Sequence, residues 1–187
     1  KSSHDFAKNI IPMMLSSSNV FAFNFKDEKA SQAKYWRDVG SMDAYFEANM
    51  DLVQVMPPIN LYNKEWPFRT YQEQYGPVKT VWAEEDSHRI GMALNSIISN
   101  GCIISGGKVK SSILSPDVRI NSFSEVEDSI LMQGVEVARY AKIRRAIIDK
   151  NVKVPQKMEI GYNLEEDKKR FTVTESGIVV IPKGMIL

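Results

Sequence analysis

Residues 97–160 decide the fold of this chain: IISNGCIISGGKVKSSILSPDVRINSFSEVEDSILMQGVEVARYAKIRRAIIDKNVKVPQKMEI. Branched aliphatic residues recur here with a period of 17 residues and internal steps of 6, 6 and 5, at Ile97, Ile103, Val109, Leu114, Ile120, Val126, Leu131, Val137, Ile143, Ile148, Val154 and Ile160. These spacings match neither the 3.6-residue helical period nor leucine-rich repeats. The pattern predicts a parallel β-helix in which each coil has three short strands and each of these side chains points inward.

Two satellite columns keep the same period and support this register, namely Ile113, Ile130, Ile147 and Val118, Val135, Val152. The residues between them are mostly Ser, Asp, Asn, Gly and Lys, which are typical of corners and solvent-facing positions. Four coils stacked at the interstrand spacing form a prism only about 19 Å tall. We therefore expect the prism to be a platform that docks to another part of the protein.

Composition places the 187 residues in the class of soluble globular chains, because 43% are hydrophobic and 25% are charged. The net charge of +1 gives no bulk electrostatic support for binding nucleic acid. No apolar run reaches the roughly 18 residues of a membrane span, so no membrane partner is expected. The lone Cys102 excludes an internal disulfide and is expected to pack in the core, which suits a cytoplasmic location. The chain starts at Lys1 without Met, and we expect further sequence upstream.

Local signals predict three elements before residue 57. Ser3 is placed to cap a short helix that ends at Pro12, and the aromatic-rich residues 20–25 predict a strand. Ser41 is placed to cap a second helix with an apolar face that includes Phe46.

Asp38 is the best candidate for chemistry, because it precedes the N-terminus expected at Ser41. A carboxylate there can help to hold Mg²⁺, which binds through one or two carboxylates together with substrate phosphates. An aspartate at this place also caps turns, and the local sequence favours that simpler role.

The rest of the chain predicts an ordered arm and a cap. Residues 54–80 combine four prolines with aromatic residues, which favours an arm packed between domains over a flexible linker. After Ile160, the pairs Glu165/Lys169 and Glu166/Arg170 indicate a short helix. Residues 177–182 predict a closing strand.

Basic residues near the end of the repeat form a candidate anion site for a phosphorylated effector. They are Lys142, Arg144, Arg145 and Lys150, with Lys183 further along the chain. Alternation turns Lys142 and Arg144 outward beside the inward Ile143. The local sequence by itself favours a simpler explanation of the same residues, a solvated charged face. The chain's histidines, His4 and His88, lie outside the coils, which disfavours an acyltransferase with a histidine base in the repeat.

The sequence closely resembles the bacterial ADP-glucose pyrophosphorylases (glucose-1-phosphate adenylyltransferases) over essentially its whole length. The matching stretches include residues 35–40 (YWRDVG), 66–71 (WPFRTY), 99–106 (SNGCIISG), 118–122 (VRINS) and 144–150 (RRAIIDK). The resemblance implies the end of an α/β nucleotidyltransferase domain in residues 1–56, an interdomain arm in 57–94 and a left-handed parallel β-helix with a cap in 95–187. It also implies that the Gly-rich phosphate loop precedes Lys1, so this segment alone is expected to be inactive.

The same resemblance implies the reaction and its residues. The complete enzyme makes ADP-glucose and pyrophosphate from ATP and glucose 1-phosphate for glycogen biosynthesis. Asp38 matches the second Mg²⁺-ligating aspartate, and Trp36 matches a residue on the sugar side of the pocket.

Regulation and assembly also follow from the resemblance. Lys150 and Lys183 match effector-binding positions for phosphorylated activators and AMP, and the family is homotetrameric. Relatives commonly carry Arg at position 150, so the identity of the effector stays open. Two alternatives also stay open at this point: a non-catalytic β-helix scaffold or regulatory protein, and another sugar-nucleotide pyrophosphorylase.

Overall fold

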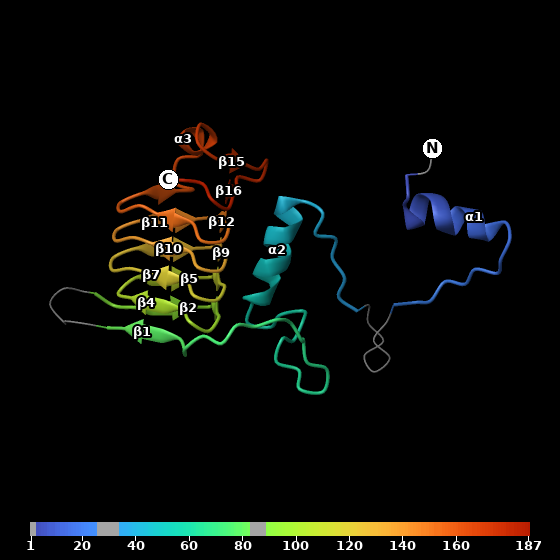
Figure 1. The fold of residues 1–187 in the computed structure, drawn as a ribbon, viewed down its shortest axis with the longest axis horizontal. Coiled ribbons are helices and arrows are strands. Elements are labelled where there is room, and N and C mark those ends of the chain that lie inside the picture. Colours follow the sequence, from blue (N-terminus) through green and yellow to red (C-terminus); the bar gives the residue numbers. More distant parts are fainter. Residues whose placement is uncertain (1–2, 26–33, 83–88) are drawn as a thin grey trace. The chain divides into compact units, whose positions relative to one another are not determined.

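The computed structural model describes residues 3–25, 34–82 and 89–187 and divides the chain into two compact units, residues 1–36 and residues 37–187. The second unit contains the parallel β-helix that the 17-residue period predicts (Figure 1). The domain limits at residues 56 and 94 stay predictions.

The first unit contains a π-helical turn, η1 (Phe6–Ile10), followed by α1 (Ile11–Leu15). Asp5 caps η1, because its side chain accepts a 2.8 Å hydrogen bond from the backbone N–H of Lys8. The predicted cap at Ser3 and the predicted stop at Pro12 are therefore wrong. Pro12 lies in the first turn of α1, where its missing N–H has no helical partner to lose.

Residues 20–25 form no strand within the described part of this unit, contrary to prediction. Aromatic residues favour extended backbone, but a strand also needs a neighbour to complete its hydrogen bonds. Phe21 and Phe23 are largely exposed in the unit taken by itself.

The β-helix of the second unit has three sheets that the chain visits in turn. The first sheet contains β1 (Lys79–Val81), β4 (Ile103–Ser105), β7 (Arg119–Ile120), β10 (Glu136–Val137) and β13 (Lys153–Val154). The second contains β2 (Met92–Leu94), β5 (Lys108–Lys110), β8 (Glu125–Glu127), β11 (Lys142–Arg144) and β14 (Glu159–Ile160). The third contains β3 (Ile97–Ile98), β6 (Ile113–Leu114), β9 (Ile130–Leu131), β12 (Ala146–Ile148), β16 (Val179–Ile181) and β15 (Thr172–Val173).

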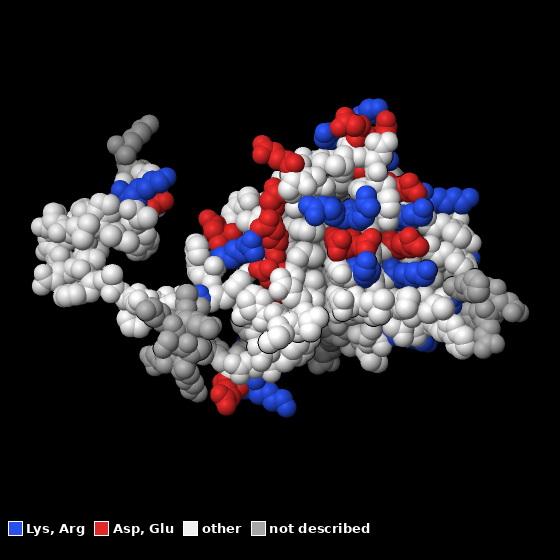
Figure 2. All heavy atoms as spheres, turned by 180° about the vertical axis from the view of Figure 1, so that it is seen from behind, with Lys and Arg blue, Asp and Glu red and all other residues white. Residues whose placement is uncertain are grey.

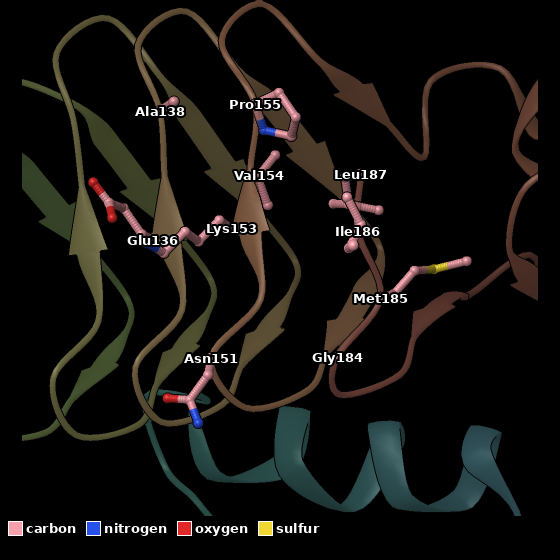
Figure 3. A pocket seen from close by; sticks show the side chains of 10 residues that line it. All are labelled: Glu136, Ala138, Asn151, Lys153, Val154, Pro155, Gly184, Met185, Ile186 and Leu187. Atoms are coloured by element: carbon pink, nitrogen blue, oxygen red, sulfur yellow. The ribbon is translucent and has the colours of Figure 1, made fainter.

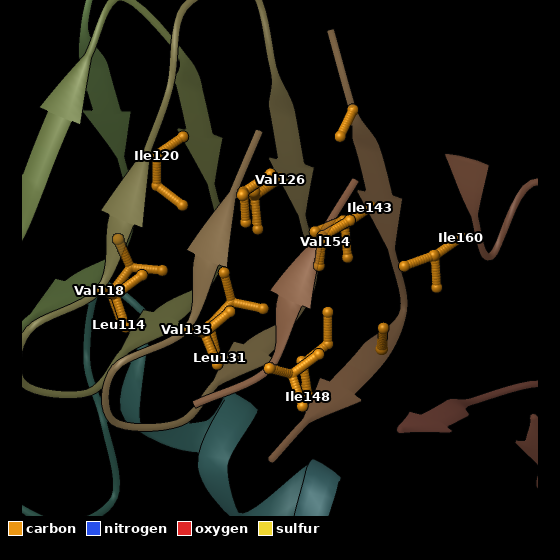
Figure 4. Close-up of a cluster of buried hydrophobic side chains, with 14 of the residues drawn as sticks. Leu114, Val118, Ile120, Val126, Leu131, Val135, Ile143, Ile148, Val154 and Ile160 are labelled. Atoms are coloured by element: carbon orange, nitrogen blue, oxygen red, sulfur yellow. The ribbon is translucent and has the colours of Figure 1, made fainter. Parts of the chain in front are cut away.

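Aliphatic side chains fill the interior of the prism in columns that run from coil to coil along its axis (Figure 4). Leu114, Leu131 and Ile148 stack on the third face, and each is fully buried. Burying one such side chain stabilises the fold by roughly 1.5–3 kcal/mol. The column Val118, Val135, Val152 is also buried, and Cys102 lies in the same core, as predicted.

The first coil departs from the predicted register by one residue. Ile98 pairs with Leu114 and Ile104 pairs with Ile120, so these side chains point inward in place of Ile97 and Ile103. Ile104 is fully buried, whereas Ile103 is only partly buried. The step between these first two coils is therefore 16 residues on the first and third sheets, whereas Val109 pairs with Val126 at the expected 17 on the second sheet.

A short corner at Gly106 and Gly107 causes this shift. The chain turns from β4 to β5 with one residue fewer than it uses between β7 and β8. A Cβ atom on Gly107 would lie 2.7 Å from Cγ2 of Ile120, so only glycine lets the chain cut this corner.

Residues with positive φ mark the corners of the later coils. At one corner they are Asn95, Ser111, Asp128 and Arg145, with φ between 44° and 47°. This left-handed conformation costs a non-glycine residue roughly 1–2 kcal/mol. The backbone N–H groups of Ser111, Asp128 and Arg145 each donate to a carbonyl of the previous coil, as in the 3.2 Å bond from Arg145 N to the carbonyl of Glu127. The corner therefore continues the hydrogen-bond ladder between strands.

Helix α2 (Met42–Leu52) packs on the outer surface of the third sheet (Figure 1). Ser41 caps it as predicted, because Oγ accepts a 3.2 Å hydrogen bond from Ala44 N. Phe46 is buried against Ile130, Ile147 and Ile178. Two of the three satellite isoleucines, Ile130 and Ile147, therefore pack against this helix together with Ile178.

The C-terminal residues cap the β-helix. Helix α3 (Leu164–Lys168) is followed by the antiparallel pair β15 and β16, and β16 adds to the third sheet beside β12 as the predicted closing strand. The ion pairs on α3 are Glu165–Lys168 and Glu166–Lys169, three residues apart instead of the expected four, because the helix ends at Lys168.

The aromatic arm leaves its side chains largely exposed in this unit, with Tyr62, Trp66 and Tyr71 each about four-fifths accessible. Its packing between domains stays a prediction. Across the described residues, no helix combines the length and the apolar character that crossing a membrane requires.

Substituting Ile104 and Ile103 in parallel tests the corrected register. We expect Ile104→Ala to lower the free energy of unfolding by about 3 kcal/mol, because it empties a fully buried site. Ile103→Ala, on the outer surface, is expected to cost about 1 kcal/mol or less. Urea denaturation of both variants measures the difference, and equal or reversed losses would contradict the register.

Candidate functional site

Asp38 lies in the exposed segment that leads into α2. Its Oδ1 accepts a 2.8 Å hydrogen bond from Gly40 N, which holds the carboxylate in a tight turn. A Cβ atom on Gly40 would lie 3.1 Å from this oxygen, so glycine leaves the carboxylate room. The turn occupies one oxygen and leaves the other for a ligand.

Arg37, the residue before Asp38, binds to one side of α2 through its guanidinium. Its guanidinium pairs with Glu47 and, at 2.7 Å, with Asp51. The two carboxylates are four residues apart and therefore lie on one face of the helix. Asp38 is thus held on both sides, by Arg37 before it and by the Ser41 cap after it. This role of Arg37 was not predicted from the sequence, although the four-residue spacing of Glu47 and Asp51 is a signal for it.

Trp36 is the last residue of the first unit, and its side chain is 76% exposed there. An exposed indole next to a hydroxyl-rich ligand is a usual arrangement in sugar sites, since its face is apolar and its N–H can donate. Its assignment to the sugar side of the pocket stays a prediction.

Lys150 and Lys183 meet at one corner of the β-helix through Asp149, which the sequence analysis did not single out. Oδ1 of Asp149 accepts a 2.6 Å bond from Lys150 N, and Oδ2 accepts a 3.2 Å bond from Lys183 N. Asp149 N donates to the carbonyl of Ile181 at 2.9 Å. These bonds join segments 34 residues apart and leave both lysine side chains exposed. The two predicted effector residues therefore lie close together.

A groove of about 550 Å³ runs along the first sheet beside this corner (Figure 3). One wall comes from side chains on β10 and β13, and the other comes from residues 184–187. Asn151, which follows Lys150, lines the groove together with Lys153. Its volume is in the range of small-molecule sites.

Arg144 lies on β11, on a face of the second sheet where the sign of charge alternates from strand to strand (Figure 2). The outward residues are Lys108 and Lys110 on β5, Glu125 and Glu127 on β8, Lys142 and Arg144 on β11, and Glu159 on β14. Lys142 pairs with Glu159 at 3.1 Å, and this bond raises the pKa of Lys142. Arg144 stacks over the ring of Tyr162 at 4.8 Å. The acidic rows offset the basic ones, which weakens this face as an anion site.

Arg145 points its side chain toward α2. Its Nη2 donates a 3.1 Å hydrogen bond to the carbonyl of Ser176, and Cζ lies 5.8 Å from the centre of the Phe46 ring. Strand β12 separates it from Lys150, so the structure does not gather the four predicted effector residues into one site.

Asp43, in the first turn of α2, binds the same loop that Arg145 contacts at Ser176. Its Oδ1 accepts hydrogen bonds from Ser176 Oγ and, at 2.8 Å, from Thr174 Oγ1. These bonds, with a smaller contribution from the charge of Arg145, hold the pKa of Asp43 below its usual value of 3.8. No sequence pattern predicts this contact, because Asp43 and Ser176 are 133 residues apart.

Comparisons with known proteins agree with this architecture. The sequence model of the family described as "GlmU-like, C-terminal hexapeptide" matches residues 76–181, more than half of the chain. The chain belongs to this hexapeptide family. A second model, described as nucleotidyl transferase, matches residues 1–55.

Curated relatives of this hexapeptide-family chain confirm its resemblance to bacterial glucose-1-phosphate adenylyltransferases. It is 53% identical to the glucose-1-phosphate adenylyltransferase of Koribacter versatilis (strain Ellin345), over 100% of the chain and 44% of the relative. It is 58% identical to that of Anaeromyxobacter dehalogenans (strain 2CP-C), over 98% of the chain and 46% of the relative. The chain thus spans less than half the length of the curated relatives it matches.

The described residues of the hexapeptide-family chain contain no cluster of three or more His, Cys, Asp or Glu side chains that would form a complete metal site. Mg²⁺ needs no such cluster, because it keeps several waters and takes one or two carboxylates plus substrate phosphates. Asp38, with one oxygen outside its turn, fits that role. His88, which is expected to lie outside the coils, falls outside the described residues.

The titration of Asp43 tests the contact between α2 and the β-helix. A lowered pKa means that this carboxylate stabilises the fold fully above its unfolded pKa near 3.8, and that the contribution is lost as pH falls through the lower folded value. NMR titration of the Asp43 carboxyl carbon is expected to give a pKa below 3.8. Thr174→Val is expected to raise it, and an unchanged value would contradict the contact.

Proposed function

We propose that this chain is the C-terminal part of a glucose-1-phosphate adenylyltransferase, which forms ADP-glucose and pyrophosphate from ATP and glucose 1-phosphate. The observation that carries the proposal is the similarity to proteins of that name, 46–58% identical along nearly the whole chain. The nucleotidyl transferase match to residues 1–55 supports it further.

In this proposal Asp38 is both a catalytic residue and a ligand of Mg²⁺. When bound, the cation neutralises charge on the phosphates during adenylyl transfer. The Gly40 turn and the Arg37 ion pairs keep the Asp38 carboxylate in one orientation, which lowers the ordering cost of binding. Trp36 is assigned to the sugar side of the pocket.

The β-helix serves regulation and assembly in this proposal. Lys150 and Lys183 bind phosphorylated effectors and AMP, supported by their meeting at Asp149 beside the groove on the first sheet. Arg144 gives a weaker anion contact on the charged face. The complete enzyme is an allosteric homotetramer that acts in the cytoplasm in glycogen biosynthesis.

An assay of the full-length protein tests the reaction. With Mg²⁺ and glucose 1-phosphate, we expect pyrophosphate release with ATP to exceed release with UTP, GTP or dTTP. A preference for another nucleotide would favour a different sugar-nucleotide pyrophosphorylase. No pyrophosphate with any nucleotide would favour a non-catalytic scaffold and would contradict the proposal.

Substituting Asp38 tests the metal role. In the full-length enzyme Asp38→Asn is expected to lower kcat about 100-fold or more, because it removes a charge that acts on the reacting phosphates. Folding is expected to stay intact, since Asp38 is exposed. Asp128→Asn makes the same chemical change at a β-helix corner and is expected to keep wild-type turnover. Wild-type kcat in Asp38→Asn would refute the role.

Substituting the two corner lysines tests the effector site. We expect Lys150→Ala and Lys183→Ala to raise the AMP concentration for half-maximal inhibition about tenfold each, because a charged hydrogen bond contributes roughly 1.5 kcal/mol or more. Activity without AMP is expected to be kept. Lys108→Ala, on the charged face, is the control. AMP titrations that match wild type in both variants would reject the site.

A further inference from the structure

Helix α2 connects Asp38 to the β-helix at two places. In its middle, Phe46 packs on Ile130, Ile147 and Ile178. In its first turn, Asp43 binds the loop between β15 and β16. The apolar contact fixes which face of the helix is buried, but hydrophobic packing is non-directional. The polar contact at Asp43 adds direction.

Four residues form this polar contact, which we call the α2 clamp: Asp43, Arg145, Thr174 and Ser176. Both hydroxyls donate to Oδ1 of Asp43, and Arg145 donates to the carbonyl of Ser176. Hydrogen bonds to a charged group are about twice as strong as neutral ones. The α2 clamp therefore ties the helix to the loop and the loop to a corner of the β-helix.

The loop is ordered before it meets the helix. Thr174 N donates to the carbonyl of Ile178 at 2.9 Å, and Ile178 N donates back to Thr174 Oγ1 at 3.1 Å. Gly177 has φ of 84°, a conformation that favours glycine and lets the loop close. Ile178 is itself buried against Phe46. The Thr174 hydroxyl thus serves the loop and the helix together.

Arg145 is equally constrained at its backbone. Its N–H donates to the carbonyl of Glu127, and its own carbonyl accepts a 3.0 Å bond from Val179 N. Its left-handed conformation is part of the corner. With backbone and guanidinium both engaged, Arg145 is suited to hold the loop and poorly suited to bind a mobile phosphate.

We propose that the α2 clamp consists of positioning residues for the reaction: it fixes the first turn of α2 on the β-helix and so sets the place of Asp38. The proposal rests on the proposed role of Asp38. Asp43 lies only five positions after Asp38, and the Ser41 cap and Arg37 ion pairs make that segment continuous with the helix. Arg145 is accordingly reassigned from effector binding to positioning.

The test uses the full-length enzyme with Thr174→Val, which removes the hydroxyl and keeps the shape, and with Arg145→Met, which keeps the stem. We expect each variant to raise the Mg²⁺ concentration for half-maximal activity about tenfold and to lower kcat by a similar factor, as loss of a residue that orients a metal ligand does. KM for glucose 1-phosphate is expected to change less than twofold. The AMP response is expected to stay that of wild type in Arg145→Met.

Two controls separate positioning from general stability. Thr174→Ser restores the hydroxyl and is expected to recover the Mg²⁺ dependence, whereas Thr172→Val makes the same change as Thr174→Val on exposed β15 and is expected to behave as wild type. A lower melting temperature with unchanged kcat and Mg²⁺ dependence in Thr174→Val would overturn the proposal. Loss of AMP response in Arg145→Met with normal Mg²⁺ dependence would overturn the reassignment.

Hydrogen exchange distinguishes failure of this proposal from failure of the proposed function. Amides 45–49 of α2 are expected to exchange about tenfold faster in Thr174→Val than in wild type, whatever reaction the enzyme catalyses. Faster exchange in Thr174→Val, in a protein that lacks adenylyltransferase activity, would refute the proposed function. It would still support the proposal that the α2 clamp stabilises the helix. Unchanged exchange in an active enzyme would refute the α2 clamp alone.

Discussion

Parallel pairing of strands in successive coils of the β-helix is the constraint on which the second unit depends. It forces equivalent residues of successive coils into vertical columns, so a buried position in one coil is buried in the next. Leu114, Leu131 and Ile148 form one such column inside the prism. The same rule acts outside, where Ile130 and Ile147 line up beneath Phe46 and rows of opposite charge cover the second sheet. The interior columns thus also determine the outer surfaces that carry function.

The columns were predictable from the sequence where each coil offers one clear aliphatic residue per face, as at Ile120, Val126 and Val137. They were not predictable in the first coil, because Ile97 with Ile98 and Ile103 with Ile104 give adjacent aliphatic choices. The short corner at Gly106–Gly107 determines which of these residues point inward. Its length is not evident from the sequence, because it depends on the close contact of Gly107 with Ile120 in the next coil.

The candidate site likewise combines local features that the sequence predicts with long-range contacts that it does not. The Ser41 cap and the position of Asp38 before α2 are local features, and the sequence predicted them. The contacts of Asp43 with Ser176 and of Lys183 with Asp149 join distant segments, and no periodicity announces them. Basic composition alone likewise grouped Arg145 with Lys150, although their surroundings differ. Both residues are exposed, but the Arg145 guanidinium donates a hydrogen bond to the loop after β15, at the carbonyl of Ser176.

Together these contacts give α2 a defined task in the proposed enzyme, which is to transmit the geometry of the β-helix to a carboxylate that acts on phosphates. The most direct test is a crystal structure of the full-length protein with Mg²⁺, a non-hydrolysable ATP analogue and glucose 1-phosphate. The account predicts an Asp38 oxygen about 2.1 Å from Mg²⁺, with Phe46 still seated on Ile130 and Ile147. A metal held without Asp38, or α2 detached from the third sheet, would contradict it.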